Sequence, residues 1–224
     1  WAFKVNALYG YLEGDDASNV GENPQRNLSF RTGIFDYSTQ IELNFFTYFT
    51  GSEKHRFSPY IFTGLALFSF NPKAEYDDEW YELQPLGTEG QGTTAFPDRT
   101  SYGLTQLSIP FGLGMKISVS RSVCMGIEWS MRKTFTDYID DVSRTYPDPD
   151  ILSAEKGEIS ALLSNRSIII DDEPPILPGM QRGDSTNKDW YSFAVFFITM
   201  KVGKRGKSTC RDFQSGHNYQ DYIY

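Results

Sequence analysis

Apolar and polar side chains alternate along several segments of the chain with a period of two. In residues 107–119, LSIPFGLGMKISV, large apolar side chains occupy the odd positions, and Ser, Pro, Gly or Lys the even ones. Such alternation is typical of a β-strand with one apolar and one polar face. Segments 57–70 and 189–202 are strand-like but apolar on both faces, so their orientation stays open. Alternation with the same period also occurs in segments 1–11, 35–45 and 123–131.

The connections between these six predicted strands alternate between short and long. Residues 50–56 and 120–122 are short connections, whereas 12–28, 71–102 and 136–188 are long, polar and rich in Gly, Pro and Asp. Antiparallel strands joined in this way have all their short turns at one end. A transmembrane β-barrel has short periplasmic turns and long outer loops, whereas a soluble sandwich has no reason for this pattern.

Composition narrows the class further. The mean hydropathy is -0.44, and no apolar run approaches the roughly 20 residues of a membrane helix, which excludes a helical membrane protein. A membrane barrel stays open because alternating strands do not raise the average. The net charge of -8 argues against a nucleic-acid partner, since phosphate contacts need clustered Lys and Arg.

The two faces of the predicted strands favour a membrane barrel with lipids of the outer membrane around it. The apolar face carries aromatic side chains, as expected at a membrane interface; they include Trp1, Tyr9, Tyr11, Phe35, Phe45 and Trp129. The polar face would form a packed, ion-paired interior, not a pore. Its charged members are Glu42, Lys116, Glu128 and Arg132. A lipocalin-like soluble barrel would reverse the two faces.

The sequence therefore predicts an all-β fold, an antiparallel transmembrane β-barrel. Barrels of one chain begin at eight strands, so six visible strands predict a missing N-terminal hairpin before Trp1 and a chain that is mature or truncated. We expect the barrel over residues 1–202 and a periplasmic tail over 203–224. Residues 151–164 have the apolar spacing of a short helix inside the last long loop.

Three aspartates follow the strand at 123–131 within the stretch RKTFTDYIDDVSRTYPD, residues 132–148. Asp137, Asp140 and Asp141 offer the oxygen ligands that calcium prefers, but their spacing is not that of an EF-hand. We therefore expect a solvated loop of turn residues and keep a metal site as the weaker alternative. The motifs GTEGQG (87–92) and RGD (182–184) predict no function.

Little in the sequence favours catalysis. The two histidines, His55 and His217, fall in a short turn and in the tail, so neither would reach a site in the outer loops. We predict a protein that is not an enzyme and needs no cofactor. A site built from carboxylates in the long loops is the alternative.

The two cysteines, Cys124 and Cys210, both fall on the predicted periplasmic side. The periplasm is oxidising, so a disulfide between them that holds the tail beneath the barrel is one hypothesis, and two separate thiols are the other.

The tail itself begins basic and ends aromatic. This composition suits docking to a periplasmic partner, and the alternative is a terminus without fixed structure. The residues concerned are Lys204, Arg205, Lys207, Arg211, Tyr219, Tyr222 and Tyr224.

Several stretches resemble the PorG family of outer-membrane barrels. They are RNLSFRTGIFDYSTQIELNFF (26–46), FSPYIFTGLALFSFNPKA (57–74), WYELQPLGTEGQG (80–92), SIPFGLGMKISVSRSVCMGIEWSMRKTFTDYIDDVS (108–143) and QRGDSTNKDWY (181–191). Together they cover most of the chain in order, loops included.

This resemblance implies a structural role in the type IX secretion system of gliding and secreting bacteria. It implies contact with a periplasmic ring built from a PorK-like lipoprotein and a PorN-like partner, and it brings no catalytic residues. A second hypothesis is a small outer-membrane enzyme or ligand-binding barrel that uses the long loops.

Overall fold

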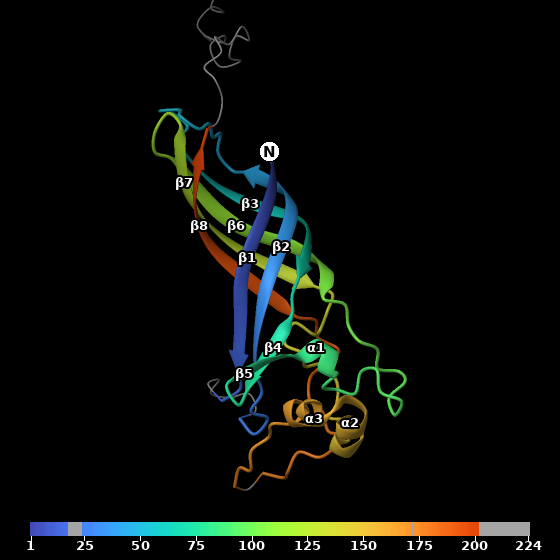
Figure 1. Ribbon diagram of the computed structural model, residues 1–224. Helices are drawn as coiled ribbons and strands as arrows, with labels where there is room; N and C mark the ends of the chain where they lie inside the picture. The colour runs from blue at the N-terminus through green and yellow to red at the C-terminus, as the bar shows by residue number, and fades with distance from the viewer. Residues whose placement is uncertain (18–23, 172, 202–224) are drawn as a thin grey trace, which may run out of the picture.

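The fold consists of β-strands and three short helices in the computed structural model of the protein, which describes residues 1–17, 24–171 and 173–201 (Figure 1). All strand pairs are antiparallel, which confirms the predicted all-β antiparallel class. The strands are β1 (Ala2–Asp15), β2 (Ser29–Asn44), β3 (Phe57–Ser69), β4 (Pro72–Tyr76), β5 (Glu79–Glu82), β6 (Thr105–Ser118), β7 (Val123–Thr134) and β8 (Trp190–Met200). The helices are α1 (Leu83–Leu86), α2 (Pro149–Lys156) and α3 (Glu158–Ser164).

Six long strands form one curved sheet in the order β1-β2-β3-β6-β7-β8. They coincide with the six strand segments expected from the alternation. The sheet rolls so far that Lys4 on β1 reaches Glu128 on β7, with an Nζ–Oε2 distance of 2.5 Å. Within the described residues β1 and β8 are not paired with each other, so the sheet is open.

Short and long connections lie at opposite ends of the sheet (Figure 1). The N-terminus and the connections 45–56 and 119–122 are at one end, called here the short-turn end, and the long connections are at the other. The first long connection is shorter than predicted, because β1 and β2 continue to the pair Asp15–Ser29. Directly opposed Glu13 and Arg31 form an ion pair there, with an Nε–Oε1 distance of 2.5 Å, and such cross-strand pairs stabilise a ladder.

The long connections contain structure of their own. The predicted loop 71–102 holds the β4–β5 hairpin, and Asp77 and Asp78 at its turn have φ angles of 53° and 62°, as a tight hairpin turn requires. The helix predicted over 151–164 is present as α2 and α3, which Gly157 separates at φ 99°. None of the helices in the described part of the chain is long and apolar enough to cross a membrane.

The sheet is inverted relative to a soluble protein, with its apolar face outside. On β2 the exposed Phe35, Tyr37 and Ile41 alternate with buried Asp36 and Gln40. The orientation of β3 and β8, open from the sequence, is now resolved. Tyr60, Phe62, Phe68 and Tyr191 are buried on the inner face, and Ile61, Leu65, Phe196 and Ile198 are exposed on the outer face.

Candidate functional site

Charged side chains inside the curved sheet pair across it. Arg132 on β7 donates from Nε to Asp36 Oδ2 on β2 at 2.9 Å, and both side chains are fully buried. Tyr191 on β8 donates its hydroxyl to the same oxygen at 3.0 Å. Since β2 and β7 are not neighbours in the sheet, this contact joins its two sides.

Two further ion pairs lie closer to the short-turn end. Lys116 pairs with Glu42, and Lys4 pairs with Glu128, which also accepts a hydrogen bond from the Tyr60 hydroxyl at 2.8 Å. The structure thus brings the four residues expected in the interior, Glu42, Lys116, Glu128 and Arg132, to the inner face. Each of them pairs with a residue of opposite charge there.

Aromatic side chains fill much of the remaining interior. A Cβ atom at Gly112 would run into the Phe62 ring, and one at Gly114 into the Tyr60 ring. Glycines at inward positions of β6 therefore make room for the rings of β3. The interior is packed by side chains at these positions, as in other small sheets that roll on themselves.

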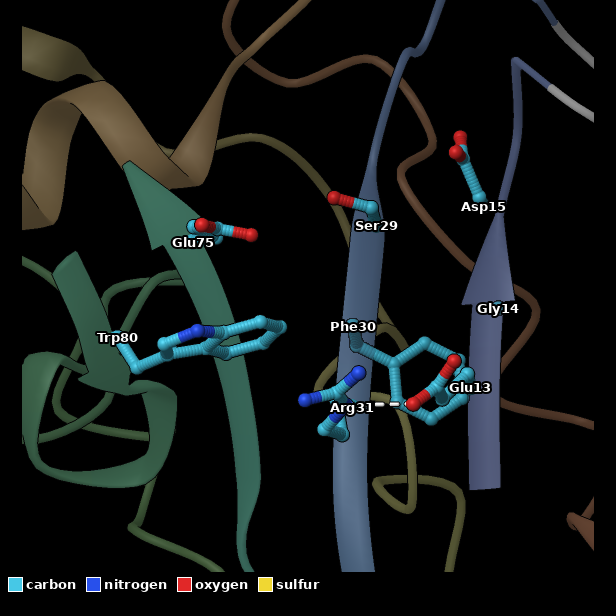
Figure 2. A pocket seen from close by; sticks show the side chains of 8 residues that line it. All are labelled: Glu13, Gly14, Asp15, Ser29, Phe30, Arg31, Glu75 and Trp80. Carbon is cyan, nitrogen blue, oxygen red and sulfur yellow. Dashed lines mark hydrogen bonds and ion pairs between the residues drawn. The ribbon is translucent and has the colours of Figure 1, made fainter. Parts of the chain in front are cut away.

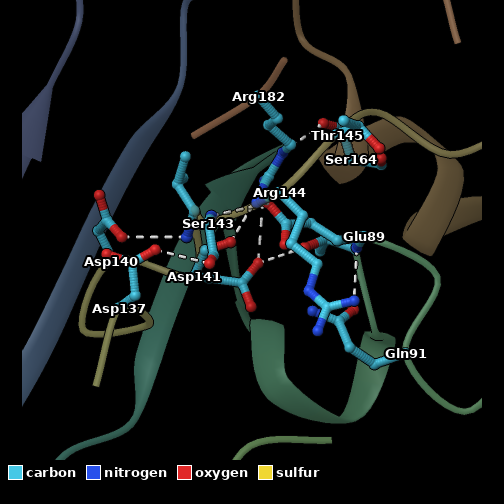
Figure 3. A network of polar contacts seen from close by, with 12 residues as sticks. Glu89, Gln91, Asp137, Asp140, Asp141, Ser143, Arg144, Thr145, Ser164 and Arg182 are labelled. Atoms are coloured by element: carbon cyan, nitrogen blue, oxygen red, sulfur yellow. Dashed lines mark hydrogen bonds and ion pairs between the residues drawn. The ribbon is translucent and has the colours of Figure 1, made fainter. Parts of the chain in front are cut away.

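A second buried network holds the long loops together. We define the loop cap as residues 71–104, 136–171 and 173–189, which lie at the end of the sheet opposite the short turns (Figure 1). Arg182 lies at its centre, where its Nη1 donates to Glu89 Oε1 at 3.2 Å and to the backbone oxygen of Asp141 at 2.5 Å. Its Nε donates to the Ser164 backbone oxygen at 3.1 Å. Figure 3 shows how one arginine joins three segments of the cap.

Glu89 is the main carboxylate partner of this arginine. It is fully buried, and its Oε1 accepts hydrogen bonds from the backbone nitrogens of Ser143 and Arg144 at 2.8 and 2.9 Å. Charge-assisted bonds of this kind are stronger than neutral ones. Glu89 therefore fixes the start of the 143–148 segment against the turn at 87–92.

The three aspartates expected in a solvated loop are instead part of this packed cap, so that prediction is wrong. Asp137 is 6% exposed and Asp141 fully buried. Asp141 accepts from Thr88 and from the Tyr102 hydroxyl at 2.7 Å, Asp137 accepts from Ser143 Oγ at 2.6 Å, and Asp140 accepts from Val142 N at 3.0 Å. The partners of Asp141 lie far along the chain, which spacing alone could not reveal.

Burial dominates the electrostatics of these carboxyls. It raises the pKa of Asp140 to about 6 and that of Asp141 to about 7, although Arg182 acts in the opposite direction on both. Burial and the nearby Asp140 carboxyl raise the pKa of Asp189 to about 7. Carboxyls of this kind bind protons more readily than those in water.

The weaker alternative for the same three aspartates was a metal site. Across residues 1–17, 24–171 and 173–201, no three His, Cys, Asp or Glu side chains gather in a way that could hold a metal ion. Figure 3 shows Asp137, Asp140 and Asp141 engaged in separate contacts. Their role in the structure is to anchor the loop.

An open cleft of about 360 Å³ lies where β1 and β2 meet the β4–β5 hairpin (Figure 2). Arg31 crosses it, paired with Glu13, and its guanidinium lies 4.7 Å from the centre of the Trp80 ring. The eight residues that line the cleft include no His, Cys or Lys. The cation of this lining, Arg31, already pairs with Glu13. The cleft is therefore better described as a surface feature than as a reactive centre.

The remaining candidates are the two cysteines and the tail. Cys124 is buried on the inner face near the short-turn end. Its suggested partner Cys210 lies outside the described residues, as does the whole proposed docking tail 203–224.

Four important charged residues were missed at the sequence level. Lys4 and Asp36 occupy polar positions of alternating strands, so the period of two could have identified them. Glu89 and Arg182 lie in the motifs GTEGQG and RGD, to which no function was assigned, and nothing in such short patterns signals a buried ion pair.

Comparison with known families gives one match. A family model described as a domain of unknown function (DUF6089) matches residues 1–159, which include strands β1 to β7, Glu89 and the three aspartates. No curated protein and no solved structure matches the chain significantly. Because the family model spans well over half of the sequence, the chain belongs to the DUF6089 family.

Proposed function

We propose that this protein is a β-barrel of the bacterial outer membrane with a structural role in the type IX secretion system. In this role the outer face of the sheet contacts lipid, and the loop cap lies outside the cell. The short-turn end and the tail face the periplasm, where they contact a ring of PorK-like and PorN-like proteins. The role is non-catalytic.

The inverted sheet is the observation that carries the membrane part of this proposal. Ile41, Leu65 and Leu113 are 53%, 65% and 52% exposed on the outer face, whereas the ion pairs are inside. Full burial of one such side chain is worth roughly 1.5–3 kcal/mol. Monomers in water rarely expose a continuous apolar surface of this kind, and a lipid environment supplies the contacts that water does not.

Strand length and aromatic placement also support this assignment. The six long strands have 11 to 16 residues, and a tilted strand needs about 9–11 to cross the hydrocarbon core. Exposed aromatic side chains lie toward both ends of the sheet, as the two interfaces of a bilayer favour. They are Trp1, Phe3, Phe45 and Phe57 toward the short turns, and Tyr9, Tyr11, Phe35 and Trp190 toward the cap.

The role in secretion rests on the resemblance to the PorG family over most of the chain. The separation of short turns from the cap supports it, because the described connections at one end of the sheet, 45–56 and 119–122, are short. In this proposal that end meets a partner in the periplasm.

Heat-dependent mobility in a gel tests the membrane part. Membrane barrels stay folded in detergent until boiled, so we expect the unheated full-length protein to migrate differently from the boiled one. We also expect it to stay with outer membranes after washing with alkaline carbonate. Recovery as a soluble protein without detergent would contradict the barrel.

Gene deletion and purification test the secretion part. We expect deletion to block secretion of type IX substrates and ring proteins to co-purify with the tagged chain. A matched variant that ends at Lys201 keeps the sheet and removes the tail, so loss of co-purification with a retained gel shift would assign the contact to the tail. Normal secretion after deletion would contradict this role and favour a small enzyme or ligand-binding barrel.

A further inference from the structure

The connection between β2 and β3 forms a hollow at the short-turn end of the sheet. The hollow has a volume of about 580 Å³ and is lined by Phe45, Phe46 and Phe57 together with the consecutive Lys54, His55 and Arg56; Thr47 and Glu53 complete it. The three phenylalanines are 57%, 57% and 44% exposed. The hollow therefore combines an apolar wall with the two cations Lys54 and Arg56.

Hydrogen bonds hold this connection against the sheet. The Phe46 nitrogen donates to Ser58 Oγ at 3.1 Å, and the Gly51 nitrogen donates to Ser118 Oγ on β6 at 2.8 Å. Within the turn, the His55 nitrogen donates to Ser52 Oγ at 3.0 Å. The cations thus project from a fixed backbone, as a binding site requires.

Charge distinguishes this end of the molecule from the other. The connections at the short-turn end carry Lys54, Arg56 and Arg121 against Glu53 alone, whereas residues 13–17, 24–31, 71–104, 135–171 and 173–189 contain 21 Asp and Glu against 9 Lys and Arg. Among the described residues neither Lys54 nor Arg56 has an ion-pair partner. This cationic turn is therefore available for an anion.

We propose that this hollow binds the headgroup of an anionic phospholipid in the leaflet that surrounds the short turns, an inference that rests on the proposed membrane function. Lys54 and Arg56 contact the phosphate, and His55 lies between them. Phe45 and Phe57 continue the apolar outer face of β2 and β3, so they lie against the acyl chains. A soluble phosphate would gain nothing from the exposed rings, whereas a lipid uses both walls.

Lipid retention tests the site. The full-length protein is placed in nanodiscs of phosphatidylglycerol and phosphatidylcholine in equal amounts, released into detergent, and its bound lipids are identified by native mass spectrometry. We expect preferential retention of phosphatidylglycerol and a loss of about fivefold for each cation removed in the double variant K54Q/R56Q. The matched control K73Q/K156Q removes two cations from the cap and should retain the wild-type preference.

Each outcome bears on the proposal. Equal retention of the two lipids by wild type, equal loss in both double variants, or displacement of phosphatidylglycerol by inorganic phosphate would overturn the headgroup site. If K54Q/R56Q loses the gel shift of a folded barrel, the variant E53Q replaces it: it removes the one acidic side chain of the hollow and should increase retention, and no increase would overturn the site. If the protein enters nanodiscs but retains both lipids equally, only the headgroup site is contradicted. If it does not enter nanodiscs, the proposed membrane function is contradicted as well.

Discussion

Arg132 and Arg182 are both buried arginines, and their surroundings separate the two halves of the molecule. Arg132 pairs with one equally buried carboxylate, Asp36, and the other two interior cations also have one carboxylate each. Arg182 instead lies among Glu89 and Asp141, and the cap contains three more carboxyls with raised pKa values; these are Asp137, Asp140 and Asp189. The sheet interior is therefore electrically balanced by pairs, whereas in the cap two buried carboxylates share the buried Arg182.

The largest effect should come from breaking the balanced pair. In R132M the Asp36 carboxylate would stay fully buried without its cation, and a broken buried pair costs about 3–5 kcal/mol. We expect the urea midpoint of the sheet, followed by the heat-dependent gel shift in detergent, to fall strongly.

The double variant R132M/D36N separates charge from volume. The amide introduced by D36N has no charge and still accepts a hydrogen bond from Tyr191, so we expect it to recover a large part of the stability lost in R132M. If the free energy of unfolding of R132M lay within about 1 kcal/mol of the wild-type value, the interior would not depend on this pair, since exposed pairs have effects of that size.

A slightly smaller and more local effect is expected from R182M. Glu89 and Asp141 would lose their shared cation and the cap its central link, at a cost of about 3 kcal/mol. Because the Arg182 side chain donates its hydrogen bonds within the cap, chymotrypsin should cleave at Tyr138 and Tyr146 while the gel shift of the sheet persists. Loss of the gel shift together with cap cleavage would show that the two halves unfold as one unit, and the comparison would fail.

The comparison also shows what a sequence can reveal about such a protein. Alternation identified the six long strands and the inner position of Arg132, because a strand with two different environments must repeat every two residues. It left β3 and β8 open, since the inner face of these strands also carries aromatic side chains, Phe62 and Phe68 on β3 and Tyr191 on β8. The cap escaped prediction because Glu89 and Arg182 meet only through tertiary packing of loops 93 residues apart in sequence, and no local pattern encodes that contact.

The pH dependence of the cap gives a third, intermediate test. Burial raises the pKa of Asp140 to about 6 and of Asp189 to about 7, above the value of about 3.8 for an unburied Asp. The folded cap therefore binds more protons than the unfolded chain between about pH 4 and pH 7, and its stability falls as the pH rises through this window. Between pH 5 and pH 6 we expect these two carboxyls to contribute a loss of about 2 kcal/mol.

Near-ultraviolet circular dichroism can follow this loss, because the rings of Tyr102 and Tyr138 stack in the cap with centroids 4.5 Å apart. Urea midpoints of this signal should be lower at pH 7 than at pH 5. The variant D140N/D189N removes two of the three carboxyls whose pKa lies near 6 to 7 and should reduce the difference, while Asp141 still titrates. If the urea midpoint of the cap instead rose with pH, these carboxyls would be stabilised in their charged form by cations, as the carboxylates inside the sheet are.

The smallest effect is expected from R144M, which removes an arginine from the cap without removing a buried charge pair. Arg144 Nη1 lies 3.2 Å from Asp98 Oδ2, but their side chains are 41% and 73% exposed, and exposed pairs contribute about 0–1 kcal/mol. The link from its backbone nitrogen to Glu89 survives the substitution. We therefore expect cleavage by chymotrypsin close to that of wild type. If R144M opened the cap as far as R182M, the number of arginines near the acidic loops would matter more than their burial, and the contrast between Arg132 and Arg182 would have to be explained by net charge.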